Sequence, residues 1–144
     1  MPSPKNREQG STLAWTALLL ALVVVPLLGL LTNTARLYLI RSGMQTATEA
    51  ACEDAAWSAA DRATFQETGV LTFLPAWQVA SIAQATYTAT LPARDRLNYI
   101  TRLQVRPDFA NRIVRCTATA RVPWLFVWGR SGFTVAAASS IRVR

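Results

Sequence analysis

One apolar stretch dominates the first third of the chain. No charged residue lies between Glu8 and Arg36, and leucine, valine and alanine make up most of the segment. As a helix, the part from Leu13 to Leu31 would be about 29 Å long, close to the ~30 Å hydrocarbon core of a bilayer. This length favours a membrane-spanning helix over the core helix of a soluble protein, and it exceeds the apolar region of a cleaved secretory signal.

The helical pattern continues beyond the apolar stretch. The polar residues at 32–34 are not helix breakers, so one helix is predicted from about Thr12 to Phe65, preceded by a disordered tail up to Gly10. Beyond Arg36 the apolar residues recur in steps of three and four, which is typical of one helix face. This seam, predicted to pack against other elements, consists of Leu37, Ile40, Met44, Ala47 and Ala51.

A second, shorter helix is predicted after Gly69, which should end the first helical region. Pro75 suits the first position of a helix because its missing N–H has no partner there in any case. Trp77, Ala80, Ile82 and Ala85 support a helix to about Ala85, and Pro92 follows it.

The rest of the chain alternates between apolar and polar residues, as strands with one buried face do. A turn is expected at Pro107–Ala110, and Pro123 should end the middle strand. Short connections predict an antiparallel sheet of three strands. The strands are expected at 99–106, 114–122 and 133–143.

The apolar face of this sheet needs a cover, and the outer half of the long helix is the natural one. Small residues on both surfaces would permit close approach. They are Ala118, Ala120 and Ala137 on the sheet and Ala47, Ala51 and Ala55 on the helix. We therefore predict an α+β fold in which a long N-terminal transmembrane helix continues into a small domain with a second helix and a three-stranded antiparallel sheet. The expected parts are a leader at 1–10, a transmembrane helix at 11–35 and the domain at 36–144.

The net charge of +7 is concentrated near the C-terminus. From Arg94 to Arg144 there are ten arginines against Asp95 and Asp108, and Lys5 is the only lysine of the chain. Such a surface would attract lipid headgroups, DNA or other anionic polymers. Arginines on the wet face of a sheet give the same pattern, and this interpretation is the more favoured of the two.

The sequence lacks the side chains of common catalytic and metal sites. There is no histidine, no CxxC, no glycine-rich phosphate loop and no HExxH, so we expect no catalytic residues, no metal and no cofactor. Asp54 and Asp61 would share a helix face seven residues apart, but acidic residues on a wet helix are far commoner than catalytic pairs. Cys52 and Cys116 would form either a disulfide or two buried thiols.

Three large aromatic residues mark a candidate interaction loop before Gly129. Trp124, Phe126 and Trp128 would either pack as a hairpin into the domain or offer a patch to a partner or to the membrane interface. The sequence favours neither alternative.

The order of these features resembles the TadE/TadG-like minor pilins of the bacterial tight-adherence (Flp) pilus system. The resemblance rests on "REQGSTLAWTALLLALVVVPLLGLL", "RSGMQTATEAACEDAAWSAA" and "VPWLFVWGRSGFTVAAASSIRVR". A short leader ending in glycine, a helix with a central proline and an arginine followed by an alanine-rich stretch are features of that family. The matching positions are Gly10, Pro26, Arg41, Met44, Gln45, Ala47, Glu49, Ala50 and Ala51.

The resemblance implies a topology that the near-balanced flanking charges leave open. The N-terminus would stay in the cytoplasm, with the domain outside, in a single-pass protein of the bacterial inner membrane that can be associated with a pilus at the cell surface. A prepilin peptidase would cut between Gly10 and Ser11. In this family a glutamate usually stands five residues after the cut, but Trp15 stands there. This difference favours a membrane anchor or a cap of an assembly over the repeating core of a filament.

We therefore expect a non-enzymatic minor pilin or pilus-assembly component. Its partners would be the lipid bilayer and other pilins or proteins of the pilus and secretion machinery. The alternative is a membrane-tethered binding module whose arginine-rich face takes DNA or other anionic surface polymers, and nucleic acid is the less favoured partner.

Overall fold

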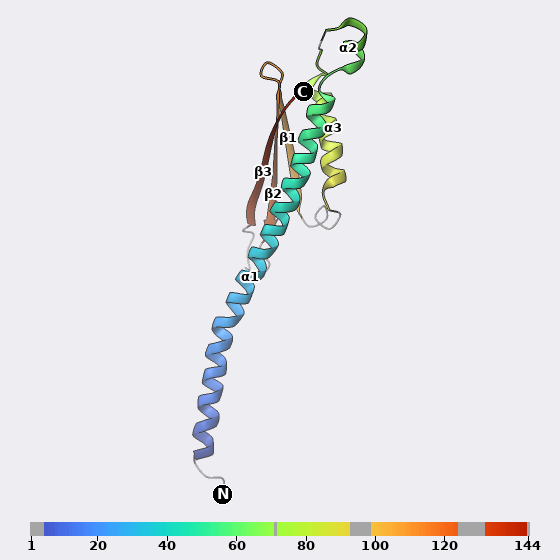
Figure 1. Ribbon diagram of the computed structural model, residues 1–144. Coiled ribbons are helices and arrows are strands. Elements are labelled where there is room, and N and C mark those ends of the chain that lie inside the picture. The colour runs from blue at the N-terminus through green and yellow to red at the C-terminus, as the bar shows by residue number, and fades with distance from the viewer. Residues whose placement is uncertain (1–4, 71, 93–98, 124–131, 144) are drawn as a thin grey trace. The chain divides into compact units, whose positions relative to one another are not determined.

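A computed structural model of the protein describes residues 5–70, 72–92, 99–123 and 132–143 (Figure 1). Its elements, in chain order, are α1 (Lys5–Ser58), α2 (Arg62–Thr68), α3 (Ala76–Thr90), β1 (Ile100–Asp108), β2 (Ile113–Pro123) and β3 (Gly132–Arg142). The chain divides into two compact units, Met1–Arg36 and Leu37–Arg144. α1 begins in the first unit and continues into the second as one helix, so the predicted long helix is confirmed.

Both predicted ends of that helix were wrong. α1 begins at Lys5, so the residues up to Gly10 do not form the expected disordered tail from Lys5 onward. The residues from Lys5 to Gly10 contain no proline, so no residue of this stretch breaks a helix that begins directly after Pro4. At the other end α1 stops at Ser58, seven residues before Phe65.

The early end of α1 has a backbone cause. Ala60 forms an antiparallel bridge with Phe73, and the amide of Leu74 donates to the carbonyl of Ala59 at 2.9 Å. These residues therefore exchange helical hydrogen bonds for bonds with a segment more than ten positions away. A pairing of this kind leaves no periodic trace, so the sequence did not reveal it.

The separate helix α2 begins at a side-chain cap. Asp61 accepts a hydrogen bond from the Thr64 amide at 3.2 Å, which satisfies one of the donors that a helix start leaves open. The Thr64 hydroxyl also donates to Asp61, at 2.5 Å. The hydrogen bonds from the Thr64 hydroxyl and amide lower the pKa of Asp61. Gly69 ends α2 with φ at 70°, a left-handed conformation that glycine adopts without a steric penalty. Asp54 and Asp61 therefore lie on different elements, and the expectation that they share a helix face was wrong.

The helix α3 is longer than predicted. It extends to Thr90, across the β-branched threonines at 86, 88 and 90 that suggested an end near Ala85. Pro75 caps the helix from just outside, so it is not the first helical residue. The buried face consists of Val79, Ala83 and Tyr87, which recur every four residues. Packing of this face decides the helix length, against the weak local preference of the threonines.

The sheet has the predicted three antiparallel strands, in the order β1-β2-β3. The expected turn at Pro107–Ala110 was placed too early, because Pro107 lies within β1 and is paired with Val114. Proline is tolerated there because β1 is an edge strand of this sheet. The turn occupies residues 109–112 and contains Arg112 at φ 53°.

The second unit has one hydrophobic core, on one face of the sheet. α1 beyond Leu37 and α3 both lie on this face (Figure 1). Along β2 the burial alternates, with one set of side chains in the core and the other in solvent. The buried set is Val114, Cys116, Ala118, Ala120 and Val122. The α+β class is therefore confirmed, with both helices on one face and solvent on the other.

Candidate functional site

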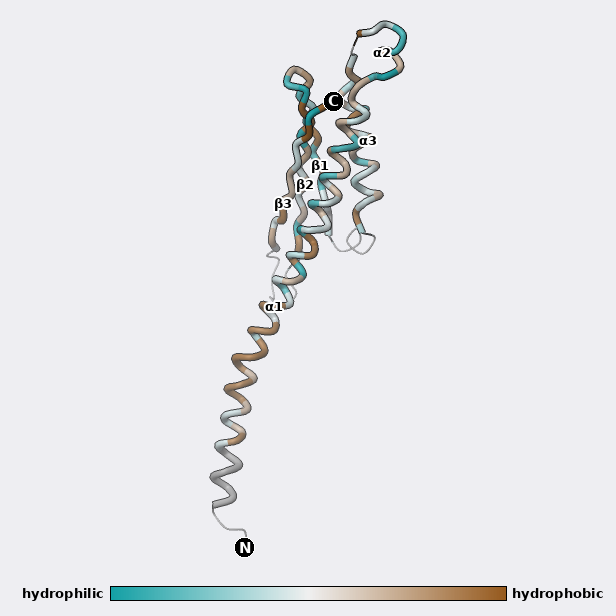
Figure 2. The backbone as a smooth tube through the Cα atoms, viewed as in Figure 1, coloured by the Kyte–Doolittle hydropathy of each residue, from teal (hydrophilic) through white to brown (hydrophobic). Residues whose placement is uncertain are grey.

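The first unit contains an apolar helical surface that no described residue of that unit covers. Large side chains from Leu13 to Leu31 are exposed, among them Leu22 at 69% and Leu31 at 62%. In Figure 2 this stretch of α1 is brown over successive turns, the colour of hydrophobic residues. Among the described residues α1 is the one helix long and apolar enough to span a membrane.

Threonine hydroxyls in and just after this segment bond to the carbonyls of the same helix. The hydroxyls of Thr32 and Thr34 donate to the carbonyls of Leu28 and Leu30, each at 2.8 Å. Thr16 donates in the same way to carbonyls one turn earlier. Backbone and hydroxyl groups in hydrocarbon have no water to bind, so these bonds suit a helix in lipid.

The predicted seam faces the core of the second unit. Met44, Ala47 and Ala51 are fully buried, Ile40 is nearly so, and Leu37 is partly buried against the same core. The same face continues through further small residues to the end of α1 and beyond it. They are Cys52, Ala55, Ala56 and Ala59. The sequence thus identified the packing face correctly up to Ala51, and Ala55 as a close contact of the sheet, but it did not extend the face to Ala56 and Ala59.

The two cysteines meet in this core, between α1 and the middle of the sheet. The Cys52 thiol donates to the carbonyl of Val114 at 3.3 Å and lies 3.6 Å from that of Ser139. Ser139 is the direct partner of Cys116 in the β2–β3 pairing. The two thiols share a hydrogen bond, which together with burial raises the pKa of Cys116. Both are free thiols in this structure.

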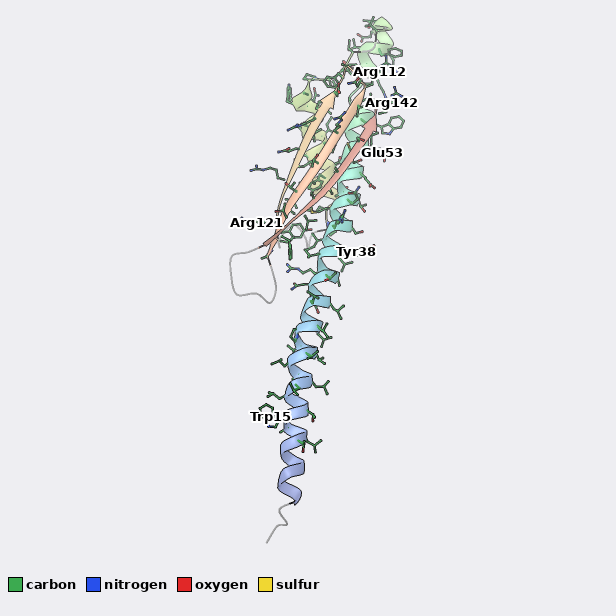
Figure 3. All side chains as sticks on the ribbon, turned by 90° about the vertical axis from the view of Figure 1, so that its left-hand side faces the viewer. Trp15, Tyr38, Glu53, Arg112, Arg121 and Arg142 are labelled. Carbon is green, nitrogen blue, oxygen red and sulfur yellow. The ribbon has the colours of Figure 1, made fainter. Side chains whose placement is uncertain are left out.

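The solvent face of the sheet carries five exposed arginines, which we call the arginine face. Strand pairing places them on one side of the sheet, because alternate residues of each strand point the same way. Arg121 lies near one end of the sheet and Arg142 near the other (Figure 3). The arginine face consists of Arg102, Arg106, Arg115, Arg121 and Arg142.

Charge on this face is poorly balanced. Arg106 and Arg115 are direct cross-strand partners, an arrangement that destabilises a sheet by like-charge repulsion. Asp108 shares their side of β1, and its pKa is lowered chiefly by hydrogen bonds from Asn111 and less by the charge of Arg115. None of the five arginines forms an ion pair with another residue in the described part of the chain. The face therefore presents an excess of positive charge to solvent.

Trp57 is an exposed aromatic residue that sequence reasoning did not single out. Its side chain is 53% exposed, and the Arg62 guanidinium lies 5.4 Å from its ring centre. It borders a hollow of about 370 Å³ on the second unit, lined also by Glu53, Ala56, Ile141 and Arg142. Its position on α1 was the sequence signal that could have identified it. Trp57 comes six residues after Ala51, so it does not share the buried face of the seam and should be exposed.

The remaining predicted sites have different outcomes. Gly10 and Ser11 lie within α1, where the backbone is helical. Asp54 accepts a hydrogen bond from the Thr86 hydroxyl, so it links α1 to α3. The predicted interaction loop, Trp124, Phe126 and Trp128, lies outside the described residues.

Comparisons with known proteins add no relative. No protein-family model matches the chain, and neither a curated protein nor a solved structure matches it. Within the described ranges, no three cysteine, aspartate or glutamate side chains gather as metal ligands would. The features that bear on function are therefore the apolar helix, the seam, the cysteine pair and the arginine face.

Proposed function

We propose that the chain is a membrane-anchored minor pilin or pilus-assembly component that acts through helix packing and protein contacts outside the cytoplasm. The observation that carries the proposal is the double use of α1. The same helix presents exposed leucines and valines before Arg36 and the buried seam from Leu37 onward. A pilin subunit needs both a helix that resides in lipid and a folded domain that the same chain continues into.

The order of sequence features supports the pilin assignment beyond a simple anchor. The resemblance to TadE/TadG-like minor pilins implies that the domain lies outside the inner membrane. It also implies contacts between the apolar helix and helices of other subunits. Such contacts in lipid are driven by close packing and not by hydrophobicity, since lipid tails are as apolar as leucine. Trp15 in place of the usual glutamate supports an anchoring or capping position.

The proposal is tested by removing the chain from its own cells and counting surface filaments. We expect filaments to be lost or sharply reduced, and to return with the wild-type chain. The variant Val23→Arg should not restore them, because a charge at the helix centre opposes membrane insertion. The matched control is Thr88→Arg, which adds the same side chain at an exposed position of α3. Unchanged filament numbers without the chain would contradict a role in the pilus.

The mature N-terminus separates a processed pilin from a plain anchor. Mass spectrometry of the protein from its own membrane should show a chain that begins at Ser11 if a prepilin peptidase acts. A chain that begins at Met1 or Pro2 would identify an unprocessed anchor. A chain that begins well beyond Leu31 would overturn the membrane assignment.

The arginine face favours a second candidate function, the binding of DNA or another anionic surface polymer. Repulsion between Arg106 and Arg115 costs stability in the free protein, and an anionic partner would relieve it. No described residue of this face is aromatic, so stacking on bases or sugars is not available there. Duplex DNA, which offers phosphates to a flat cationic surface, is the probe that suits it best.

Salt dependence tests this second function. If all five arginines contact phosphates, the logarithm of the binding constant should fall with the logarithm of salt concentration at a slope of about −4.5. Arg115→Gln should reduce that slope by about 0.9. Arg62→Gln, on α2 and away from the sheet, should leave it unchanged. Fluorescence anisotropy with a short labelled duplex gives both values, and a slope near zero would contradict the proposal.

A further inference from the structure

Two cysteines, far apart in the sequence, lie side by side in the core of the second unit. Cys52 comes from α1, and Cys116 from the middle strand of the sheet. The Cys52 sulfur lies within 3.6 Å of carbonyls on both β2 and β3. One of these carbonyls belongs to Ser139, the cross-strand partner of Cys116, so the sulfur is placed over the Cys116 position. No other cysteine is present in the chain.

We propose that Cys52 and Cys116 form an intramolecular disulfide in the mature protein, which links α1 covalently to the centre of the sheet. This inference rests on the proposed function in one respect, because it needs the domain to be in an oxidising compartment outside the cytoplasm. The reaction forms one S–S bond, and the two thiol protons end on the acceptor. The two electrons pass to the disulfide of a thiol–disulfide oxidoreductase, which is reduced to a dithiol.

The burial of both sulfurs determines when this reaction takes place. Neither cysteine is accessible to solvent in the folded domain. An oxidant protein cannot attack a sulfur that it cannot reach, and the raised pKa of Cys116 keeps that thiol protonated and unreactive. Oxidation therefore occurs while the domain folds, before α1 closes over the sheet. Once formed, the bond is protected from external reductants by the same burial.

The position of the bond fits a subunit that is held through its membrane helix. The covalent ring it closes contains α2, α3 and β1. Force applied along α1 would then pass directly to β2, the strand paired on both sides, and not only through the contacts of small residues such as Ala47 and Ala51. Without the bond, α1 is held to the sheet by packing and by hydrogen bonds such as those from Gln45 and Cys52 to strand carbonyls.

The test uses the full chain isolated from its own membrane after acid quenching, which traps thiols in their state in the cell. The sample is denatured and treated with a polyethylene-glycol maleimide, and adducts are counted by gel shift. We expect no adduct without reductant and two adducts after reduction. Two adducts without reductant would overturn the disulfide, and a dimer that disappears on reduction would show intermolecular pairing in its place.

If the native thiols are found free, a second variant shows whether the reason is that the domain lies in the reducing cytoplasm. Ser81→Cys, on the exposed face of α3, is placed in a chain that also carries Cys52→Ala and Cys116→Ala. A membrane-impermeant maleimide labels it in intact cells if the domain is outside. Labelling together with free native thiols would overturn the disulfide but leave the proposed function standing. Labelling only after lysis would overturn the extracytoplasmic placement, and the disulfide with it.

The melting temperature of the purified chain distinguishes a disulfide between the two cysteines from packing of two free thiols. We expect Cys52→Ala, Cys116→Ala and the double variant to lower the melting temperature by similar amounts, since either single change removes the whole bond. Reductant should then have no further effect on any of the three. Reductant should lower the melting temperature of the wild type to that of the variants, and a wild-type melting temperature that reductant leaves unchanged would overturn the covalent link.

Discussion

The two halves of α1 share one backbone but differ in the side chains they carry. Before Arg36 the helix presents large leucines and valines around its whole circumference, and they remain exposed. After Leu37 one face of the helix is buried; it begins with Ile40 and Met44 and consists mostly of alanines from Ala47 onward. The backbone is helical in both halves, although Pro26 in the first half cannot donate a backbone hydrogen bond, so the helix itself does not specify what it meets. Side-chain size does: large residues suit a fluid hydrocarbon surface, and small ones permit close approach to a sheet.

The largest expected effect comes from a charge placed in the apolar half of α1, which should prevent this half from entering a membrane. Val23→Arg should cost about 2.5–3.5 kcal/mol of insertion free energy at the helix centre. We expect the variant to shift from the membrane fraction to the soluble or aggregated fraction, measured by sedimentation and immunoblotting. The same arginine at Tyr38, an exposed position of the second unit, should leave the distribution unchanged. Equal distributions for both variants would show that the apolar half does not anchor the chain.

A larger side chain in the seam should destabilise the domain that the half of α1 after Leu37 packs into. Ala51 is fully buried among core residues, so Ala51→Leu should destabilise the domain by about 1–3 kcal/mol through overpacking. Thr46→Leu adds the same side chain to the exposed side of the same helix and should change stability by less than about 0.5 kcal/mol. Chemical unfolding followed by circular dichroism measures both. If the two variants unfold at the same denaturant concentration, α1 is not packed by its small residues.

A buried hydroxyl in the core offers a smaller and pH-dependent effect. The Tyr87 hydroxyl forms no hydrogen bond with another described residue, although Thr101 is near enough to affect its ionisation. Burial raises the pKa of Tyr87. At neutral pH, Tyr87→Phe should therefore change stability by no more than about 1 kcal/mol, with stabilisation the expected direction.

The sign of the pH effect follows from the raised pKa. An unfolded tyrosine ionises near pH 10, and the folded one at a higher pH, so the unfolded state loses its proton first. The stabilisation is fully present below about pH 10 and is lost as the pH rises through the folded pKa. Above pH 10, the melting temperature of the wild type should fall more steeply with pH than that of Tyr87→Phe. Parallel curves would show that the Tyr87 hydroxyl is not protected from water.

Periodicity in the sequence identified the parts of the structure that depend on local pattern. The apolar half of α1, the seam from Leu37 to Ala51, the three strands and the inward face of β2 all follow from spacing alone. The errors fall where a distant segment decides the local conformation. α1 ends early because Ala60 pairs with Phe73, and α3 extends to Thr90 because Tyr87 packs into the core.

The candidate sites show the same division. The sequence predicted that Cys52 and Cys116 could meet, since both fall on inward faces, but only the structure brings the two sulfurs together. The excess of arginine was visible in the composition. Its arrangement on one sheet face needed the register, which sets Arg106 opposite Arg115. Trp57 gave no signal in the periodic pattern of α1, because it lies off the seam.

Pro107 has a consequence for the behaviour of many copies crowded together. β1 is an edge of the three-stranded sheet, and an open edge is a template on which another chain can add a strand and start to aggregate. Pro107 has no amide proton to offer such a strand, and Arg102 and Arg106 on the same strand repel an identical neighbour. Copies of the chain at high concentration can therefore come into contact through other surfaces without their sheets joining at this edge.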